Sequence, residues 1–208
     1  MPPTLAIECA TTACSVALFE NGELVDGRYE VLGRGHAERL VPMIAELPGK
    51  GRAARIVVSL GPGSFTGVRI GLATGRALGL AWGSQVLGYP TLALVAAMAR
   101  AKRPGEPVSV CMTGGHGEWF VQNFGLDAEP DDVLLSLPPR EAAAACRHAI
   151  LAGSQARAAA AMLDEEREAL DILPDARQAH LLPEREIAAH LSPIYGRPPD
   201  ARLPGAAA

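Results

Sequence analysis

Glycine recurs at every fourth position between residues 67 and 83, inside a segment whose other residues favour a helix. The row consists of Gly67, Gly71, Gly75, Gly79 and Gly83. Gly71, Gly75 and Gly79 fall in the interior of a helix expected over 66–82, where each disfavours the helix by about 1 kcal/mol relative to alanine. Together they cost roughly 3 kcal/mol, a large share of a domain's net stability of about 5–15 kcal/mol. Something must therefore pack closely against this row.

Residues four apart advance by about 40° around a helix, so the glycine row traces a slowly winding groove. Because no Cβ atom fills this groove, another helix can approach it closely. Two kinds of neighbour can fill it: the chain's own sheet or helix 36–47, and a helix of another subunit. For the row as a whole we expect helix-on-helix contact, including contact with another subunit.

The first half of the chain alternates strand and helix patterns. Residues 4–10 and 14–20 are apolar runs typical of strands, and Asn-Gly at 21–22 predicts a hairpin into a third strand over 23–32. Apolar spacing predicts a helix over 36–47. A strand over 54–61 then precedes the glycine helix over 66–82. A short strand over 85–90 leads to a helix over 91–101, with Thr91 as its N-cap. The order βββαβαβα predicts an α/β fold with a mixed sheet.

A linker-like stretch at 102–107 divides the chain into a first unit, 1–102, and a smaller second unit, 103–208. In the second unit the pattern restarts with weaker signals. We expect strands over 107–113, 117–124 and 148–153. We also expect a helix over 138–147 and an alanine-rich helix over 154–170. Near the end we expect helices over 174–182 and 183–191, an extended segment over 192–199 and a frayed tail over 201–208.

Composition excludes several classes of protein. The 208 residues are 49% hydrophobic, which suits a buried core, and the formal net charge of −4 gives no electrostatic footprint for nucleic acid. Residues 77–99 carry no formal charge, but glycines and Pro90 break them into helix, turn, strand and helix rather than one membrane span. The N-terminal sequence does not support a signal peptide, so we expect a cytoplasmic protein. The four cysteines lack a C-x-x-C spacing and are expected to be reduced structural thiols.

The loop "SLGPGSFTG" lies between a strand and a helix, where backbone N–H groups can hold an anion. It lacks the lysine of a Walker A loop, so a tight turn made by Gly61 and Gly63 is the alternative. Ser64 is not in a G-x-S-x-G elbow, and an N-cap role for Ser64 or Thr66 is expected instead. The weak candidates for nucleotide binding are Glu8, Thr11, Thr12, Gly61, Gly63 and Ser64. For Glu8 and the threonines, local hydrogen bonding within the turn is the alternative.

The five histidines form no close pair suited to one metal ion, so no metal site is expected. His116 beside Glu118 could serve as an acid–base pair, but the surrounding glycines are typical of a hairpin connection. No catalytic residue is assigned from these patterns.

The stretches "LAIECATTACSVALFENGEL", "GHAERLVPMIAEL", "SLGPGSFTGVRIGLATGRALGLAWG" and "SPIYGRPPDA" resemble the TsaB (YeaZ) family. The resemblance covers residues 4–101 and, more briefly, 193–201, and "GPGSFTGVRIG" is its most specific string. It implies a fold of two related lobes of the ASKHA type, the actin-like, sugar-kinase and Hsp70-like class. It also implies a bacterial role in forming threonylcarbamoyladenosine at position 37 of tRNA, as a noncatalytic partner of the catalytic subunit TsaD.

The resemblance further implies pairing with TsaD through first-lobe helices, with the ATPase TsaE completing the assembly. The catalytic subunit's His-Met-Glu-Gly-His metal motif corresponds to Thr-Leu-Ala-Leu-Val at 91–95 here, whose apolar side chains cannot ligate iron or zinc. Glu8 stands where the family usually has Asp. In the second lobe, Thr113-Gly114-Gly115 replaces a usual Asp-Ala-Arg, although Glu118 and Phe120 remain, and Gly196 replaces a usual Leu.

From these observations we expect a noncatalytic scaffold with no cofactor of its own, which binds neither tRNA directly nor a membrane. The predicted partner-binding residues are His36, Leu40, Met43, Ile44, Gly67, Arg69, Ile70, Gly71, Thr74, Gly75, Leu78 and Gly79. A homodimer through the same helices is expected when the partner is absent. The alternatives are an independent ASKHA phosphotransferase that uses Glu8 and loop 61–67, a glycoprotease-like hydrolase, and a direct tRNA-binding module.

Overall fold

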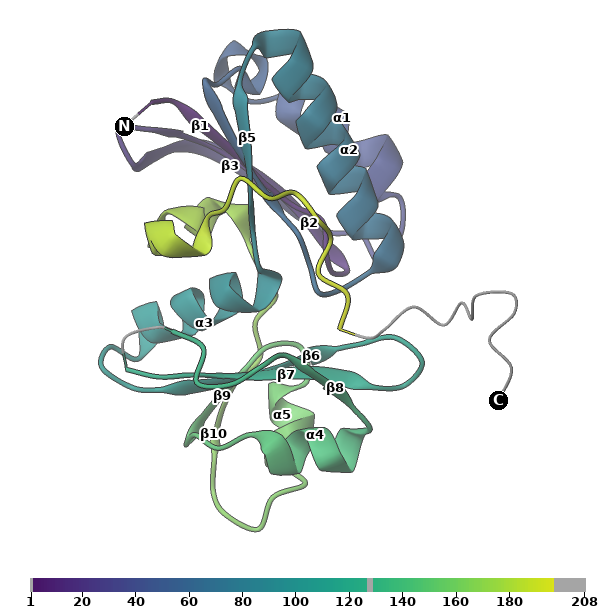
Figure 1. The fold of residues 1–208 in the computed structure, drawn as a ribbon, viewed down its shortest axis with the longest axis vertical. Helices are drawn as coiled ribbons and strands as arrows, with labels where there is room; N and C mark the ends of the chain where they lie inside the picture. Colours follow the sequence, from purple (N-terminus) through teal and green to yellow (C-terminus); the bar gives the residue numbers. More distant parts are fainter. Residues whose placement is uncertain (1, 127–128, 197–208) are drawn as a thin grey trace.

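A computed structural model describes residues 2–126 and 129–196. The first lobe contains a five-stranded sheet in the order β3-β2-β1-β4-β5 (Figure 1). Its antiparallel strands are β1 (Thr4–Glu8), β2 (Ala13–Glu20) and β3 (Glu23–Val31), and β4 (Arg55–Ser59) and β5 (Gln85–Tyr89) continue the sheet in parallel with β1. The predicted Asn-Gly hairpin is confirmed, because both residues of that turn have positive φ.

Two helices cover one face of this sheet, α1 (His36–Ala45) and α2 (Phe65–Trp82). Their apolar sides form a core with β1, β2 and β4, which includes Leu5, Ile7, Leu40, Met43 and Ile56. The 3-10 helix η1 (Pro48–Gly51) leads from α1 back to β4. The predicted order βββαβαβα is confirmed for the first lobe, with α3 (Thr91–Lys102) as its last helix.

The second lobe repeats this plan with shorter elements. Its sheet has the order β10-β9-β6-β7-β8. β6 (Val108–Thr113), β7 (Trp119–Phe124) and β8 (Leu135–Leu137) are antiparallel, and β9 (Ile150–Ala152) and β10 (Glu168–Leu170) lie parallel to β6. The helices α4 (Pro139–Ala145) and α5 (Ala156–Ala160) take the places of α1 and α2. The expectation of two related lobes is therefore confirmed.

Helix α3 lies between the two sheets, as Figure 1 shows, and the 3-10 helix η2 (Ala176–Leu181) packs beside it. One hydrophobic core joins both sheets through α3 and includes Tyr89, Leu92, Val110 and Phe124. After η3 (Glu184–Glu186) the chain returns to the first lobe, where Ala188 bridges Gly88 at the edge of β5. The two lobes are thus tied together by α3 and by the last described segment.

Several predicted elements of the second half are wrong. The alanine-rich run 154–170 forms a short helix, a loop and then β10, because pairing of Glu168–Leu170 with β9 outweighs local helix propensity. The runs 174–182 and 183–191 contain only 3-10 turns, and β8 was not predicted. In the first lobe the predicted N-cap of α3 is also wrong, because Pro90, not Thr91, occupies that position, and the Thr91 hydroxyl lies 2.6 Å from that of Ser59. The expected tail at 201–208 lies outside the described residues.

The uncharged run 77–99 is divided between α2, β5 and α3, as its glycines and proline predict. Among the described residues, no helix combines the length and the apolar character needed to cross a membrane.

Candidate functional site: a cleft between the lobes and an outward helix face

The glycine row of α2 faces the chain's own sheet. A Cβ atom on Gly71 would lie 3.5 Å from Val58, and one on Gly75 would lie 3.7 Å from Ile56, while a Cβ on Gly67 would overlap the carbonyl oxygen of Cys9. The prediction that this row opens onto another helix or subunit is therefore wrong. The glycines let α2 lie close to β1 and β4, and the burial of apolar side chains under it offsets their cost in helix propensity.

The loop before α2 forms a tight turn, as the alternative interpretation proposed. Ser64 is the N-cap of α2, and its Oγ accepts a hydrogen bond of 3.2 Å from the backbone N–H of Gly67. Gly61 has φ of +87°, which favours glycine, and a Cβ on Gly63 would overlap the carbonyl oxygen of Ala10. The glycines at 61 and 63 are thus required by backbone conformation and by close approach to the β1–β2 turn.

A cleft of about 380 Å³ opens where the corresponding turns of the two lobes face each other. The first lobe contributes the β1–β2 turn and the start of α2, and the second contributes the β6–β7 turn and Ser154 before α5. The sequence-predicted candidates that line it are Thr11, Thr12, Gly63 and Ser64. None of the described residues that line it has a charged side chain.

Glu8 does not line this cleft. Its carboxylate is fully buried and accepts hydrogen bonds from the Ala10 N–H at 2.7 Å and from the Tyr89 hydroxyl at 3.3 Å. Burial raises its pKa from 4.5 to about 7, and these hydrogen bonds limit the rise. The prediction that Glu8 meets a nucleotide or magnesium is not supported, and the alternative of local hydrogen bonding is confirmed.

His36 also has a local role. Its Nε2 donates to the carbonyl oxygens of Thr11 at 2.9 Å and Ala13 at 3.3 Å, and so holds the β1–β2 turn against the start of α1. The Thr11 hydroxyl accepts from the Ala13 N–H at 3.2 Å. Both observations agree with a structural use of polar groups in this turn.

Most predicted partner-binding residues face inward. The buried ones are His36, Leu40, Met43, Ile44, Gly67, Gly71, Gly75 and Gly79. Ile70, Thr74 and Leu78 are half-buried, and Arg69 is exposed, with its guanidinium 3.1 Å from the Tyr195 hydroxyl. Apolar spacing marks the side of a helix that covers the sheet, so most of the residues chosen by this spacing are not accessible to another chain.

The outward sides of the same helices carry two other rows of small apolar residues. We call this surface the alanine face; its exposed residues are Ala37, Val41 and Ala45 of α1 and Ala73, Ala77 and Ala81 of α2. Within each helix the members are four residues apart and so lie on one side. Leu80, 89% exposed, lies beside the α2 row. Sequence reasoning missed this surface because the glycine spacing has the same period, and only packing shows which row is covered.

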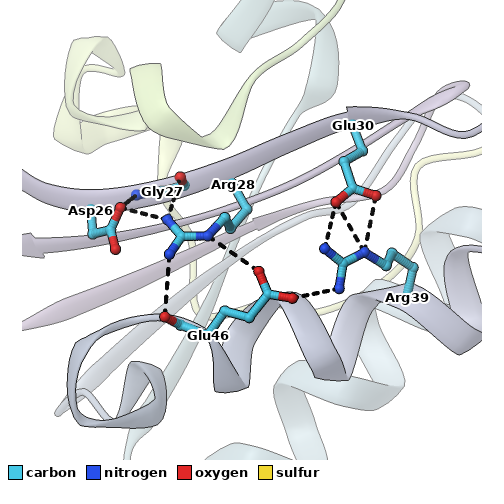
Figure 2. A network of polar contacts seen from close by, with 6 residues as sticks. All are labelled: Asp26, Gly27, Arg28, Glu30, Arg39 and Glu46. Carbon is cyan, nitrogen blue, oxygen red and sulfur yellow. Dashed lines mark hydrogen bonds and ion pairs between the residues drawn. The ribbon is translucent and has the colours of Figure 1, made fainter.

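A network of ion pairs fixes α1 at the edge of the sheet (Figure 2). Arg39 of α1 contacts Glu30 of β3 at 2.5 Å and Glu46 at 2.7 Å, and Arg28 of β3 contacts Glu46 at 3.3 Å and Asp26 at 2.6 Å. These side chains are about one third exposed, so the network is a surface feature.

No group of three or more potential metal-ligating side chains occurs among residues 2–126 and 129–196. Residues Thr91 to Val95 are buried in α3. In the second lobe, His116 lies in an exposed turn, and the carboxylate of Glu118 accepts a hydrogen bond of 2.6 Å from Ser136. Gly196 sits against Phe120, whose ring a Cβ at this position would overlap.

Comparison with known proteins agrees with this architecture. A family model described as TsaD, tRNA N6-adenosine threonylcarbamoyltransferase, matches residues 30–136. The TsaB protein of Escherichia coli is 38% identical over 130 residues, which are 59% of this chain and 55% of that protein. TsaB of Haemophilus influenzae is 40% identical over 102 residues, 47% of this chain and 42% of that protein. The chain thus spans about half the length of the curated relatives it matches.

Solved structures extend the likeness to the second lobe. YeaZ from Pseudomonas aeruginosa is 28% identical, with a TM-score of 0.80, and the match covers 94% of this chain and 100% of that one. The ethanolamine utilization protein EutJ from Carboxydothermus hydrogenoformans shares the fold alone, at 12% identity, a TM-score of 0.52 and coverage of 88% and 90%. The expected two-lobed ASKHA fold is confirmed. The chain belongs to the family whose model is described as TsaD, and within it to the TsaB (YeaZ) group.

Proposed function

We propose that this chain is a noncatalytic subunit in the formation of N6-threonylcarbamoyladenosine in tRNA. The relatives in Escherichia coli and Haemophilus influenzae are named for the biosynthesis of this nucleoside. A TsaD-type subunit performs the transfer, and a TsaE-type ATPase completes the assembly. The site of action is the cytoplasm, where tRNA is modified.

The cleft supports the noncatalytic assignment. Transfer of a phosphoryl or carbamoyl group uses charged side chains or metal ions to stabilise the charge that develops in the transition state. The described residues that line this cleft offer hydroxyl and backbone groups, and the nearby carboxyl of Glu8 is buried and engaged in local hydrogen bonds.

The alanine face is the observation that carries the partner assignment. Two helices that contact each other present rows of small apolar side chains outward, with the exposed Leu80 beside the α2 row, so a helix of another protein can pack closely against these rows. The TsaD-type subunit is the occupant that we propose for this face. Without it, a second copy of the chain takes its place and forms a homodimer.

To test the assignment, we would replace Ala77 by Arg and measure co-elution with the TsaD-type protein of the same organism. Arginine at this exposed helical position leaves the fold intact but places a long charged side chain in the contact, so we expect at least a tenfold loss of affinity. Val41→Arg on α1 is expected to act in the same way. The control is Met162→Arg in the second lobe, where the native side chain is 48% exposed.

Undiminished complex formation by both variants would overturn the partner assignment. The noncatalytic assignment has a separate test, because the purified chain should show no turnover of ATP with magnesium by itself. Turnover that survives repeated purification would support the independent enzyme instead.

A further inference from the structure

The β1–β2 turn contains two thiols to which the proposed function gives no role. Cys9 follows β1, and Cys14 is the second residue of β2. Because Glu8 pairs with Ser15 in the sheet, Cys9 and Cys14 are the next pair of residues opposite each other. Their Sγ atoms are 3.6 Å apart, and both residues are buried.

The backbone between the two cysteines is anchored from several sides. The Ala10 carbonyl accepts from the Ser64 N–H at 2.7 Å, and the Ala10 N–H donates to the Glu8 carboxylate at 2.7 Å. The Thr11 carbonyl accepts from the His36 ring at 2.9 Å. The two sulfur atoms are therefore held side by side by the fold, and do not depend on a chance encounter within a loose loop.

The interaction between the thiols makes them chemically unequal. With Cys9 as the S–H donor, the hydrogen bond lowers the pKa of Cys14 and raises that of Cys9, whose burial raises its pKa further. Cys14 is thus the better thiolate, and thiolates are the nucleophilic form of cysteine. A disulfide requires an S–S distance of about 2.05 Å, so the sulfur atoms need to approach by roughly 1.5 Å.

We propose that Cys9 and Cys14 form an intramolecular disulfide on exposure to a peroxide, which makes this turn an oxidative modification site in the cleft wall. The Cys14 thiolate attacks one peroxide oxygen, the O–O bond breaks, and Cys14 becomes a sulfenic acid while the departing hydroxide takes a proton to become water. The Cys9 sulfur then attacks the Cys14 sulfur, the S–O bond breaks, and the Cys9 proton leaves with the second water. Two thiols and hydrogen peroxide give one disulfide and two waters.

Burial determines which oxidant can react. Residues of this turn line the cleft, so a molecule as small as hydrogen peroxide can reach the pair by a small local opening. Glutathione disulfide is far larger and is excluded by the same packing. The product is therefore the internal disulfide, which closes the base of the turn that carries Thr11 and Thr12.

The second lobe supplies an internal control. Cys111 and Cys146 are also buried and interact with each other, and the Cys146 thiol additionally donates to the Ala142 carbonyl at 3.4 Å. They lie between β6, α4 and α5, in a core with Trp119 and Leu151. Met112 beside Cys111 lines the cleft, but no residue of α4, which leads into Cys146, does so. In the first lobe, three cleft-lining residues connect the two cysteines directly, namely Ala10, Thr11 and Thr12, so we expect the Cys9–Cys14 pair to react first.

The test treats the native full-length chain with a few equivalents of hydrogen peroxide, alkylates all remaining thiols in denaturant, and maps the tryptic peptides by mass. The first site of cleavage by trypsin is Arg28, so Cys9 and Cys14 lie in one peptide. We expect this peptide to be unalkylated and about 2 Da lighter than its reduced, unmodified form, with Cys111 and Cys146 alkylated. Dithiothreitol should restore two alkylated cysteines in that peptide.

Two results would overturn the proposal: alkylation of all four cysteines after a treatment that oxidises free cysteine, or first loss of the Cys111–Cys146 pair. Cys14→Ser provides a second measurement. In this variant the first peptide should retain alkylated Cys9 or carry added oxygen, without the loss of 2 Da, and circular dichroism reports whether the variant folds. Because the wild-type map needs no substitution, the proposal remains testable even if the variant does not fold.

Discussion

The two lobes have the same strand order but very different outer layers. In the first lobe, helices of 10 and 18 residues cover the sheet, whereas the corresponding helices of the second lobe have 7 and 5 residues. The strand order does not depend on helix length, because the strands are connected in the same sequence whether the helices between them are long or short. A partner surface of the kind proposed here needs helices of several turns, and only the first lobe has them.

The polar groups buried in the two sheets also differ. In the first lobe Glu8, an ionisable group, anchors the end of β1. In the second lobe the neutral side chain of Asn123 on β7 is buried and binds Ser109 at 2.6 Å, Asp132 at 2.6 Å and the Arg147 N–H at 3.1 Å. The first lobe therefore has a titratable carboxyl group at its buried anchor, whereas the buried anchor of the second lobe is a neutral amide.

The largest effect should come from the helix layer of the first lobe. In Gly67→Ala, the new Cβ would overlap the Cys9 carbonyl, and the backbone there has no room to move without separating α2 from β1. We expect a loss of about 3 kcal/mol or more in the free energy of unfolding, measured by urea denaturation.

Gly75→Ala is the matched control in the same row. Its Cβ would make an ordinary contact of 3.7 Å with Ile56, and alanine favours the helix interior. This variant should be more stable by about 0.5–1 kcal/mol. Equal destabilisation by both alanines would contradict the described packing of α2 on the sheet.

The next effect concerns pH. The folded protein holds the Glu8 proton up to about pH 7, whereas the unfolded chain releases it near pH 4.5, so stability falls as the pH rises through this window. The loss should reach about 3 kcal/mol. Glu8→Gln removes this contribution, so the difference in unfolding free energy between wild type and variant should change between pH 4.5 and 7.5. A constant difference over that range would argue against a buried titrating Glu8.

A smaller effect is expected for the neutral group of the second lobe. Asn123→Ala leaves the Ser109 hydroxyl and the Arg147 N–H without their buried acceptor, which should cost about 2 kcal/mol. The cost should be nearly the same at pH 5 and pH 8, because Asn123 itself does not titrate. If the cost of Asn123→Ala instead changed with pH as the contribution of Glu8 does, the pH dependence of stability would not be confined to the first lobe.

The smallest effect should come from the surface network. Arg39→Met removes the contacts to Glu30 and Glu46 but keeps the aliphatic part of the side chain. We expect a slightly lower Tm in dilute buffer, and a difference that disappears in about 1 M salt, because salt screens exposed ion pairs. A difference that persisted in high salt would indicate that Arg39 stabilises α1 by packing.

Local patterns predicted the first lobe well, because its elements are long and regularly patterned. The hairpin at Asn21 and Gly22, the N-cap at Ser64 and the order of strands and helices all follow from residues near one another in sequence. In the second lobe the strand predicted over 148–153 is confirmed as β9, but β8 and β10 were missed, because they have three residues each, too few to show a period. Their positions depend on pairing between residues distant in sequence, which local patterns do not contain.

The candidate site shows the same limit. Residues of the cleft turns, Thr11, Thr12, Gly63 and Ser64, could be selected from sequence because strand ends and helix starts mark such turns. The burial of Glu8 and the direction of the glycine row could not, since both depend on which element packs against which.

The sequence by itself determined the family, the strand order of the first lobe and the presence of a helix on which small residues recur every fourth position. Only the tertiary structure decided that the glycines of this helix face the sheet and that its alanines face outward. The physical reason is that spacing fixes which residues share a side of a helix, whereas the neighbour on that side is chosen by close packing among segments far apart in the chain.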